Sequence, residues 1–396
     1  MKKKFFALFL VLIYPTLNYG QDDKSEGYRF TPLKEIKHTT VENQSRSSTC
    51  WCFSGISFLE AELIRIGKPE VDLSEMYIVR NAFSDKADKY VRMQGNVNHA
   101  GGGSYWDVIE TIRRCGLVPE EAYQGLNYGE DIHTHGEIDA VTRAYLDALI
   151  KNPNRKLSTA WKRGYEGILN AYFGENPKTF MFDGKEYTPQ SFLQFMGLNL
   201  DDYIYITSFS HHQFYSKFIL EVPDNWAYGE VYNLPIEELG QVIRNAVENG
   251  YTVAWASDIS EKGFSWKNGV AVIPDVNYVD MSTSDKERWT KLPQNEKDEQ
   301  LYSFEKPGYE KVITQELRQL EFDNFKTTDD HGMHIVGTAN DQNGKLYYKV
   351  KNSWGTNDKY KGYFYASEAF VLFKTTSIMI NKNALPKPIA RKLGLE

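Results

Sequence analysis

The stretch that decides the fold reads Glu42-Asn43-Gln44-Ser45-Arg46-Ser47-Ser48-Thr49-Cys50-Trp51-Cys52-Phe53-Ser54. Beyond it, apolar residues recur at helical spacing as far as Ile66, and Gly67 and Pro69 end the pattern. Cys50 is therefore predicted to begin a helix. The partial positive charge of a helix N-terminus lowers the pKa of a thiol, so Cys50 is a candidate nucleophile.

Gln44, six residues before Cys50, is the candidate oxyanion donor. Attack on a carbonyl builds negative charge on oxygen, and the Gln44 amide with the backbone N–H of Cys50 would stabilise it. The alternative for Gln44 is a polar loop residue. For Cys50 it is a buried core thiol, which is also the expected role of Cys52, because Cys52 points to another face of the helix.

Two downstream runs, Asp330-His331-Gly332-Met333 and Lys351-Asn352-Ser353-Trp354-Gly355, supply a histidine and an asparagine in the order of a Cys/His/Asn catalytic set. His331 is the predicted base. Asn352 would accept the imidazole N–H and Trp354 would shield that bond, unless Asn352 is only a turn residue. His334, three residues along the same predicted strand, would face away from the cleft.

Together these segments resemble the papain-like cysteine peptidases, and most closely their aminopeptidase C and bleomycin hydrolase branch. The resemblance implies an α+β, two-lobed fold, with a helical lobe, a β-barrel-like lobe and a large insertion. Ser47 stands where secreted papain relatives usually carry a disulfide cysteine, which favours this branch. The expected segments are a signal peptide at 1–20, the helical lobe at 21–129, the insertion at 130–235 and the β-rich lobe at 236–396.

By position, the glycines Gly101 to Gly103 resemble the family's substrate strip, so Gly102, Gly103 and Trp354 are the predicted substrate-binding residues; a plain flexible loop is the alternative for the glycines. The resemblance further implies peptide substrates trimmed from the amino end by way of a C-terminal arm, and a hexamer. The approach to such an arm is present at Lys382 to Pro386, but the sequence ends at Glu396. An endopeptidase or dipeptidyl peptidase with an open groove is therefore the alternative, and whether the C-terminus reaches the cleft stays open.

The N-terminus has the layout of a secretory signal: Lys2 to Lys4, an apolar run from Phe5 to Ile13, then small and polar residues to Gly20. An exported protein, periplasmic or secreted, follows, with no membrane contact after the signal is removed. The net charge of −7 and the lack of basic blocks give no sign of nucleic-acid binding.

Three cysteines form no disulfide framework, although a Cys52–Cys115 pair stays open. The histidines His133, His135, His211 and His212 show no metal-ligand spacing with the cysteines or one another, and we assign them to solvated loops. No metal or cofactor is expected.

Elsewhere, hydrophobic patterning predicts two helices and several strands. The helices are expected at 104–115 and 236–249. The strands are expected at 203–206, 252–256, 331–339, 346–351 and 362–366. The charged segment from Ser282 to Gln300 is expected to be an exposed loop.

The sequence is compatible with two classes of function. The first is an exported thiol peptidase that uses Cys50, His331, Asn352 and Gln44. The second is a catalytically idle module of the same fold that binds peptides.

Overall fold

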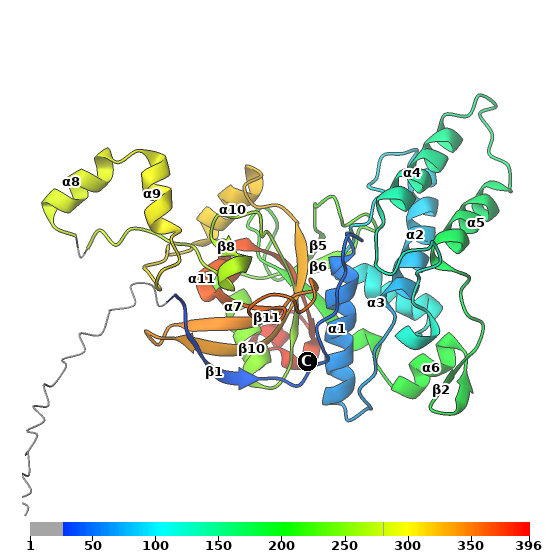
Figure 1. Cartoon of the computed structure of the whole chain (residues 1–396), viewed down its shortest axis with the longest axis horizontal. Helices are drawn as coiled ribbons and strands as arrows, with labels where there is room; N and C mark the ends of the chain where they lie inside the picture. Colours follow the sequence, from blue (N-terminus) through cyan, green and yellow to red (C-terminus); the bar gives the residue numbers. More distant parts are fainter. Residues whose placement is uncertain (1–26, 280) are drawn as a thin grey trace, which may run out of the picture.

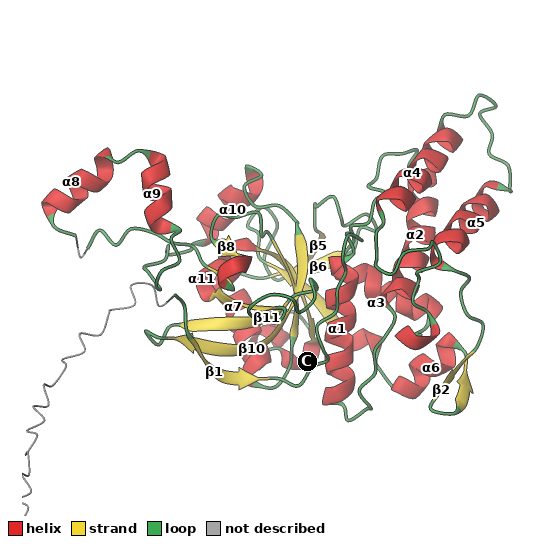
Figure 2. Cartoon of the chain, viewed as in Figure 1, coloured by secondary structure: helices red, strands yellow, loops and turns green. Residues whose placement is uncertain are grey.

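The computed structural model describes residues 27–279 and 281–396, so the expected signal peptide lies outside the described residues. The chain forms a helical lobe and a strand-rich lobe, with α1 at their boundary (Figures 1 and 2). Each lobe has its own large apolar core. The expected α+β class is confirmed.

Six helices and a short hairpin build the helical lobe. Their cores share one cluster, which includes Phe58 of the first helix and Phe83 of the second. The helices are α1 (Cys50–Arg65), α2 (Glu75–Arg92), α3 (Tyr105–Cys115), α4 (Gly136–Ile150), α5 (Trp161–Phe173) and α6 (Pro189–Met196), and the hairpin is β2 (Phe180–Phe182) with β3 (Lys185–Tyr187).

An 11-stranded sheet builds the other lobe, in the order β5-β6-β4-β13-β7-β10-β11-β12-β9-β8, with β1 on β10. The strands are β1 (Phe30–Glu35), β4 (Tyr203–Thr207), β5 (Lys217–Ile219), β6 (Glu230–Asn233), β7 (Val253–Ser257), β8 (Phe264–Ser265), β9 (Val270–Ala271), β10 (His331–Asp341), β11 (Leu346–Lys351), β12 (Tyr363–Ser367) and β13 (Thr375–Asn381). The lobe's helices are α7 (Ile236–Glu248), α8 (Thr283–Lys291), α9 (Gln294–Leu301), α10 (Gln315–Asp323), α11 (Glu368–Lys374) and α12 (Lys387–Lys392).

Strands from different segments of the expected domain organisation pair with one another in the sheet. β1, in the segment expected to be helical, pairs antiparallel with β10. β4, in the expected insertion, pairs with β13, and β6 then extends the sheet from β4. The sheet therefore takes strands from all three expected segments, because a strand's pattern gives its exposed face and not its partner.

Helix α1 lies against β10 at the boundary of the lobes, and a glycine permits the contact. A Cβ at Gly332 would lie 2.7 Å from Ser54 Oγ and 3.2 Å from the carbonyl oxygen of Cys50. Because no side chain fits there, β10 can run beside the first turn of α1. This contact places the start of β10 next to the start of α1.

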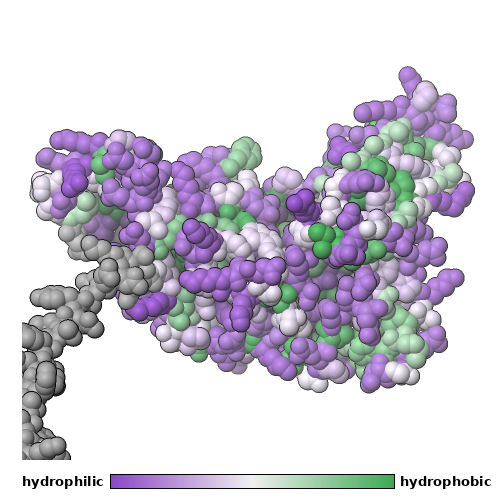
Figure 3. Space-filling model, in the orientation of Figure 1, coloured by the Kyte–Doolittle hydropathy of each residue, from purple (hydrophilic) through white to green (hydrophobic). Residues whose placement is uncertain are grey.

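The charged segment expected to be a loop forms two helices instead, α8 and α9, so that prediction is wrong. Ser282 caps α8 by accepting from the backbone N–H of Asp285. No residue of either helix is buried, which is why no apolar stripe marked them in the sequence. They project from the strand-rich lobe, and the face in Figure 3 is mainly hydrophilic there.

The C-terminal residues pack on the strand-rich lobe. Ile389 and Leu393 are buried in its core, and Leu395 packs against the same cluster. Residues 382–396 contribute no lining residue to either pocket that contains Cys50. Within the described residues no helix is long and apolar enough to cross a membrane.

Candidate active site

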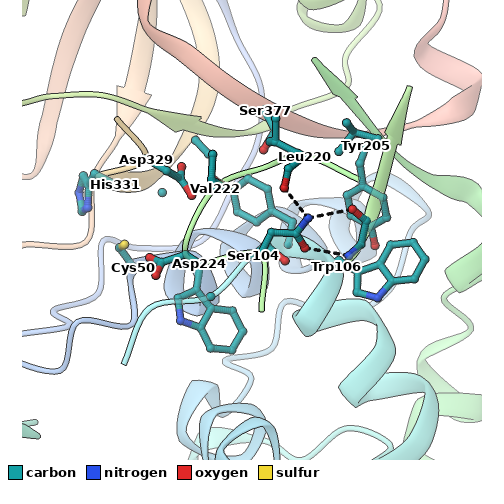
Figure 4. Close-up of a pocket in the computed structure, with 18 of the residues that line it drawn as sticks. Cys50, Ser104, Trp106, Tyr205, Leu220, Val222, Asp224, Asp329, His331 and Ser377 are labelled. Carbon is teal, nitrogen blue, oxygen red and sulfur yellow. Dashed lines mark hydrogen bonds between the residues drawn. The ribbon is translucent and has the colours of Figure 1, made fainter. Parts of the chain in front are cut away.

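The cleft between the lobes contains Cys50, the first residue of α1, and His331, the first residue of β10. Both side chains line the same two adjoining pockets, and Figure 4 shows them on one side of the more enclosed pocket. Cys50 is partly exposed, whereas Cys52 is fully buried and its thiol donates to the carbonyl of Glu75. All three cysteines are free thiols, so Cys52 and Cys115 do not pair.

His331 and Asn352 form the expected pair. The distance from His331 Nε2 to Asn352 Oδ1 is 2.7 Å. The backbone N–H of Ser353 also donates to this Oδ1, at 2.8 Å, which identifies the atom as the amide oxygen. Nε2 must then carry the proton, and Nδ1 of the neutral ring is free to accept a proton from a thiol.

Trp354 covers this pair as expected. Its ring centroid lies 4.9 Å from that of His331. Trp266 in turn packs on Trp354, with centroids 5.0 Å apart. The indole therefore limits the access of water to the bond between His331 and Asn352.

Burial dominates the ionisation of the two reactive groups. It raises the pKa of Cys50 to about 12, and the nearby Asp329 and Asp224 also raise it. Burial likewise lowers the pKa of His331 to about 4. Burial therefore outweighs the lowering of the thiol pKa expected from the helix N-terminus, and a thiolate at Cys50 would need a nearby positive charge, such as a protonated His331, to stabilise it.

Gln44 is held on the same side of the cleft as Cys50 by Ser353. The Ser353 hydroxyl donates to Gln44 Oε1 at 2.6 Å, and the backbone N–H of Gln44 donates to the Ser353 carbonyl at 2.8 Å. With Oε1 engaged, the amide Nε2 remains available to the cleft, which Gln44 lines together with Cys50. Between them, Ser45 and Ser48 adopt positive φ of 50° and 56°, a strained backbone of the kind found at functional sites.

The glycines Gly101 to Gly103 form a tightly packed edge of the cleft. Trp51 Nε1 donates to the Gly101 carbonyl at 2.9 Å, and a Cβ at Gly103 would lie 2.8 Å from the Trp51 ring. The buried Lys86 ammonium donates to the Ala100 carbonyl at 2.7 Å and also to the Gly102 carbonyl. The strip is therefore fixed in place, which does not support the flexible-loop alternative.

The second histidine of β10, His334, lies on the other side of the strand. Its Nδ1 is 2.9 Å from the Ser57 hydroxyl, and the side chain is buried behind α1. As expected, it does not line the pockets that contain Cys50.

Several site residues were not anticipated from the sequence. Ser353 directly follows Asn352 in the Lys351 to Gly355 run, so its place next to a candidate residue was the signal that could have identified it. Asp224 and Asp329 line the more enclosed pocket, which holds about 610 Å³ of empty space, and no motif marks either of them. Residues of the β5–β6 region, Leu220, Val222 and Val231, also line it.

Two expectations about histidines are corrected. His211, His212 and Glu221 bring ligand atoms within 4.8 Å of one another, so they have the geometry of a possible metal site, with each imidazole at present bonded to Glu221. His135 is not solvated but fully buried, and its ring packs against Phe173.

Comparison with known proteins places this site in context. Residues 294–395 match the model of the Peptidase C1-like family. Aminopeptidase G of Lactobacillus delbrueckii subsp. lactis is 24% identical over 400 residues, covering 89% of this chain and 83% of that protein. Aminopeptidase C of Listeria monocytogenes serovar 1/2a is 21% identical over 403 residues, covering 91% and 84%.

A solved structure shares the fold. The crystal structure of PepW from Lactobacillus rhamnosis HN001 superimposes with a TM-score of 0.70 at 19% identity. The match covers 92% of this chain and 84% of that one.

Proposed function

Because the chain belongs to the papain-like aminopeptidase C family of cysteine peptidases, we propose that it is an exported aminopeptidase that hydrolyses peptides through Cys50, His331, Asn352 and Gln44. The observation that carries the assignment of these residues is the His331–Asn352 bond of 2.7 Å in the cleft that contains Cys50. The names of the relatives, aminopeptidase G and aminopeptidase C, support amino-terminal trimming.

The proposed reaction begins when His331 Nδ1 takes the thiol proton and Cys50 Sγ attacks the scissile carbonyl carbon. The resulting oxyanion accepts from Gln44 Nε2 and the Cys50 N–H, the latter unpaired within a helix at its first residue. His331 returns the proton to the leaving amine, and water then hydrolyses the thioester by the same route. Asn352 keeps the imidazole oriented throughout.

Export and assembly are parts of the same proposal. The layout of residues 1–20 supports export to the periplasm or exterior. The family resemblance supports a homo-oligomer of six subunits. Fractionation of the cells and the mass of the purified protein in solution test these two points.

The test of the activity uses one unblocked peptide and its N-acetylated twin, incubated under reducing conditions and read by mass spectrometry. We expect stepwise loss of amino-terminal residues from the free peptide. Cys50→Ala should lower the rate by about 10⁴-fold or more, because the covalent step is lost. The variant's circular dichroism should match the parent.

The outcomes separate the alternatives. Cys50-dependent internal cuts in both peptides would indicate an endopeptidase with an open groove. Absence of any Cys50-dependent product, with Cys50 alkylated no faster than Cys115, would indicate the idle peptide-binding module.

A further inference from the structure

Asp224 places a carboxylate directly on the glycine strip. A Cβ built on Gly102 would lie 2.2 Å from Asp224 Oδ2 and 2.4 Å from Oδ1, so the carboxylate is packed against the Gly102 backbone. The same carboxylate lines both pockets that contain Cys50. Figure 4 shows it beside Cys50 in the more enclosed pocket. A peptide lying along the strip would therefore meet Asp224.

The loop that carries Asp224 is rigidly held. The buried Asn225 donates to the carbonyls of Leu220 and Gly229, each at 2.9 Å, and accepts from the Gly229 N–H at 2.8 Å (Figure 4). Gly229 packs against Trp106, where an added Cβ would lie 2.7 Å from the indole. Asn98 donates to Asp224 Oδ1 at 2.9 Å, which fixes the carboxylate itself.

The charge around Asp224 favours a cationic ligand. Four acidic residues, Asp224, Glu230, Asp329 and Asp330, line the more enclosed pocket, and neither pocket has a lysine or arginine among its lining residues. Burial raises the pKa of Asp224, and the buried Lys86 and the hydrogen bond from Asn98 partly offset this rise by favouring the ionised form. Lys86 also interacts with Asp107, so its single positive charge is shared between Asp107 and Asp224.

We propose that Asp224 binds the α-ammonium group of the peptide substrate and blocks the strip beyond it, so that a loop within the expected insertion makes this enzyme select free amino termini. The inference rests on the proposed peptidase function and adds the residue that sets its substrate class. Asp224 is a binding residue that takes no part in the proton transfers. Asp224 would thus supply the group that binds the substrate's amino end, whereas residues 382–396 pack on the strand-rich lobe and do not line the pocket.

The test compares kcat/KM on the free and the N-acetylated peptide for the parent protein, Asp224→Asn and Asp329→Asn. Asn preserves the shape of Asp and removes the charge. We expect Asp224→Asn to lower kcat/KM on the free peptide by about 10- to 100-fold, mainly through KM, as for a lost charged hydrogen bond. The acetylated peptide should be unaffected. Asp329→Asn, the matched control in the same pocket, should retain the preference for the free amine.

Three results would overturn the inference. One is an equal loss on both peptides in Asp224→Asn. Another is loss of the preference in Asp329→Asn alone. The third is a finding that N-acetylated peptides with Lys or Arg before the scissile residue are cleaved as fast as free peptides. That result would mean that the carboxylates bind a basic side chain.

A binding measurement separates this inference from the proposed activity. If the parent protein cleaves neither peptide, the activity proposal fails, and calorimetry on Cys50→Ala still tests the ammonium site. We expect the free peptide to bind about 10- to 100-fold more tightly than its acetylated twin, and the difference to vanish in Cys50→Ala/Asp224→Asn. Equal affinities in Cys50→Ala would reject the site.

Discussion

Ser353 illustrates how a residue acts through its neighbour. Its hydroxyl and its backbone carbonyl both bond to Gln44, while its backbone N–H bonds to Asn352 Oδ1. One residue thus orients the predicted oxyanion donor and fixes the amide that holds the imidazole. The sequence pattern marked its neighbours because their chemistry is recognisable, whereas a positioning hydroxyl has no distinctive chemistry of its own.

Gln44→Ala is expected to lower kcat by about 10²- to 10³-fold with little change in KM, because the donor acts on charge that develops only in the transition state. Ser353→Ala should have a smaller effect in the same direction, since Gln44 keeps its amide but loses its orientation. Steady-state kinetics on the free peptide measures both. An unchanged kcat in Gln44→Ala would assign the oxyanion to other donors.

At the scale of the helices, close packing of one helix against another depends on small residues. In α1, a Cβ at Gly55 would lie 2.9 Å from Val108 Cγ2 of α3. In α5, a Cβ at Gly167 would have no atom within 4 Å. The same residue type therefore has opposite consequences in two helices, and the sequence pattern alone does not distinguish them.

Gly55→Ala is expected to lower the free energy of unfolding by about 1–3 kcal/mol, because a branched valine cannot move aside in a packed core. Gly167→Ala, the matched control, should raise it by about 0.5–1 kcal/mol, because alanine has the higher helix propensity. Urea denaturation followed by circular dichroism measures both. Equal and small effects would contradict the close approach of α1 to α3.

Across the whole molecule, burial perturbs acids and histidines in opposite directions. Burial raises the pKa of Glu120 to about 8 and those of Glu60 and Asp329 to about 7. Burial also lowers the pKa of His331 to about 4 and that of His99 to about 3. The acids therefore bind extra protons in the folded state, whereas the histidines bind them in the unfolded state.

These shifts predict a fall in stability as the pH rises from about 6.5 to 8.5. The buried histidines have the opposite effect, because they bind more protons in the unfolded state and so make stability rise with pH. Unfolded histidines have a pKa near 6.5 and are mostly neutral above it, so this effect is confined to lower pH. Acids with raised folded-state pKa values lose their bound protons as the pH rises through those values. The melting temperature should fall across this range, and the fall should be smaller in Glu120→Gln. A melting temperature that rises with pH in this range would contradict the prediction.

The sequence by itself determined the α+β class, most of the elements near the site and the four residues proposed for catalysis. Those features depend on local periodicity or on side chains whose chemistry is distinctive, such as Cys50 at a helix start. The tertiary structure decided the strand partners of β1 and β4, the exposed helices α8 and α9, and the packing of the C-terminus on the strand-rich lobe. It also placed Asp224 on Gly102, since only folding brings two residues 122 positions apart into contact.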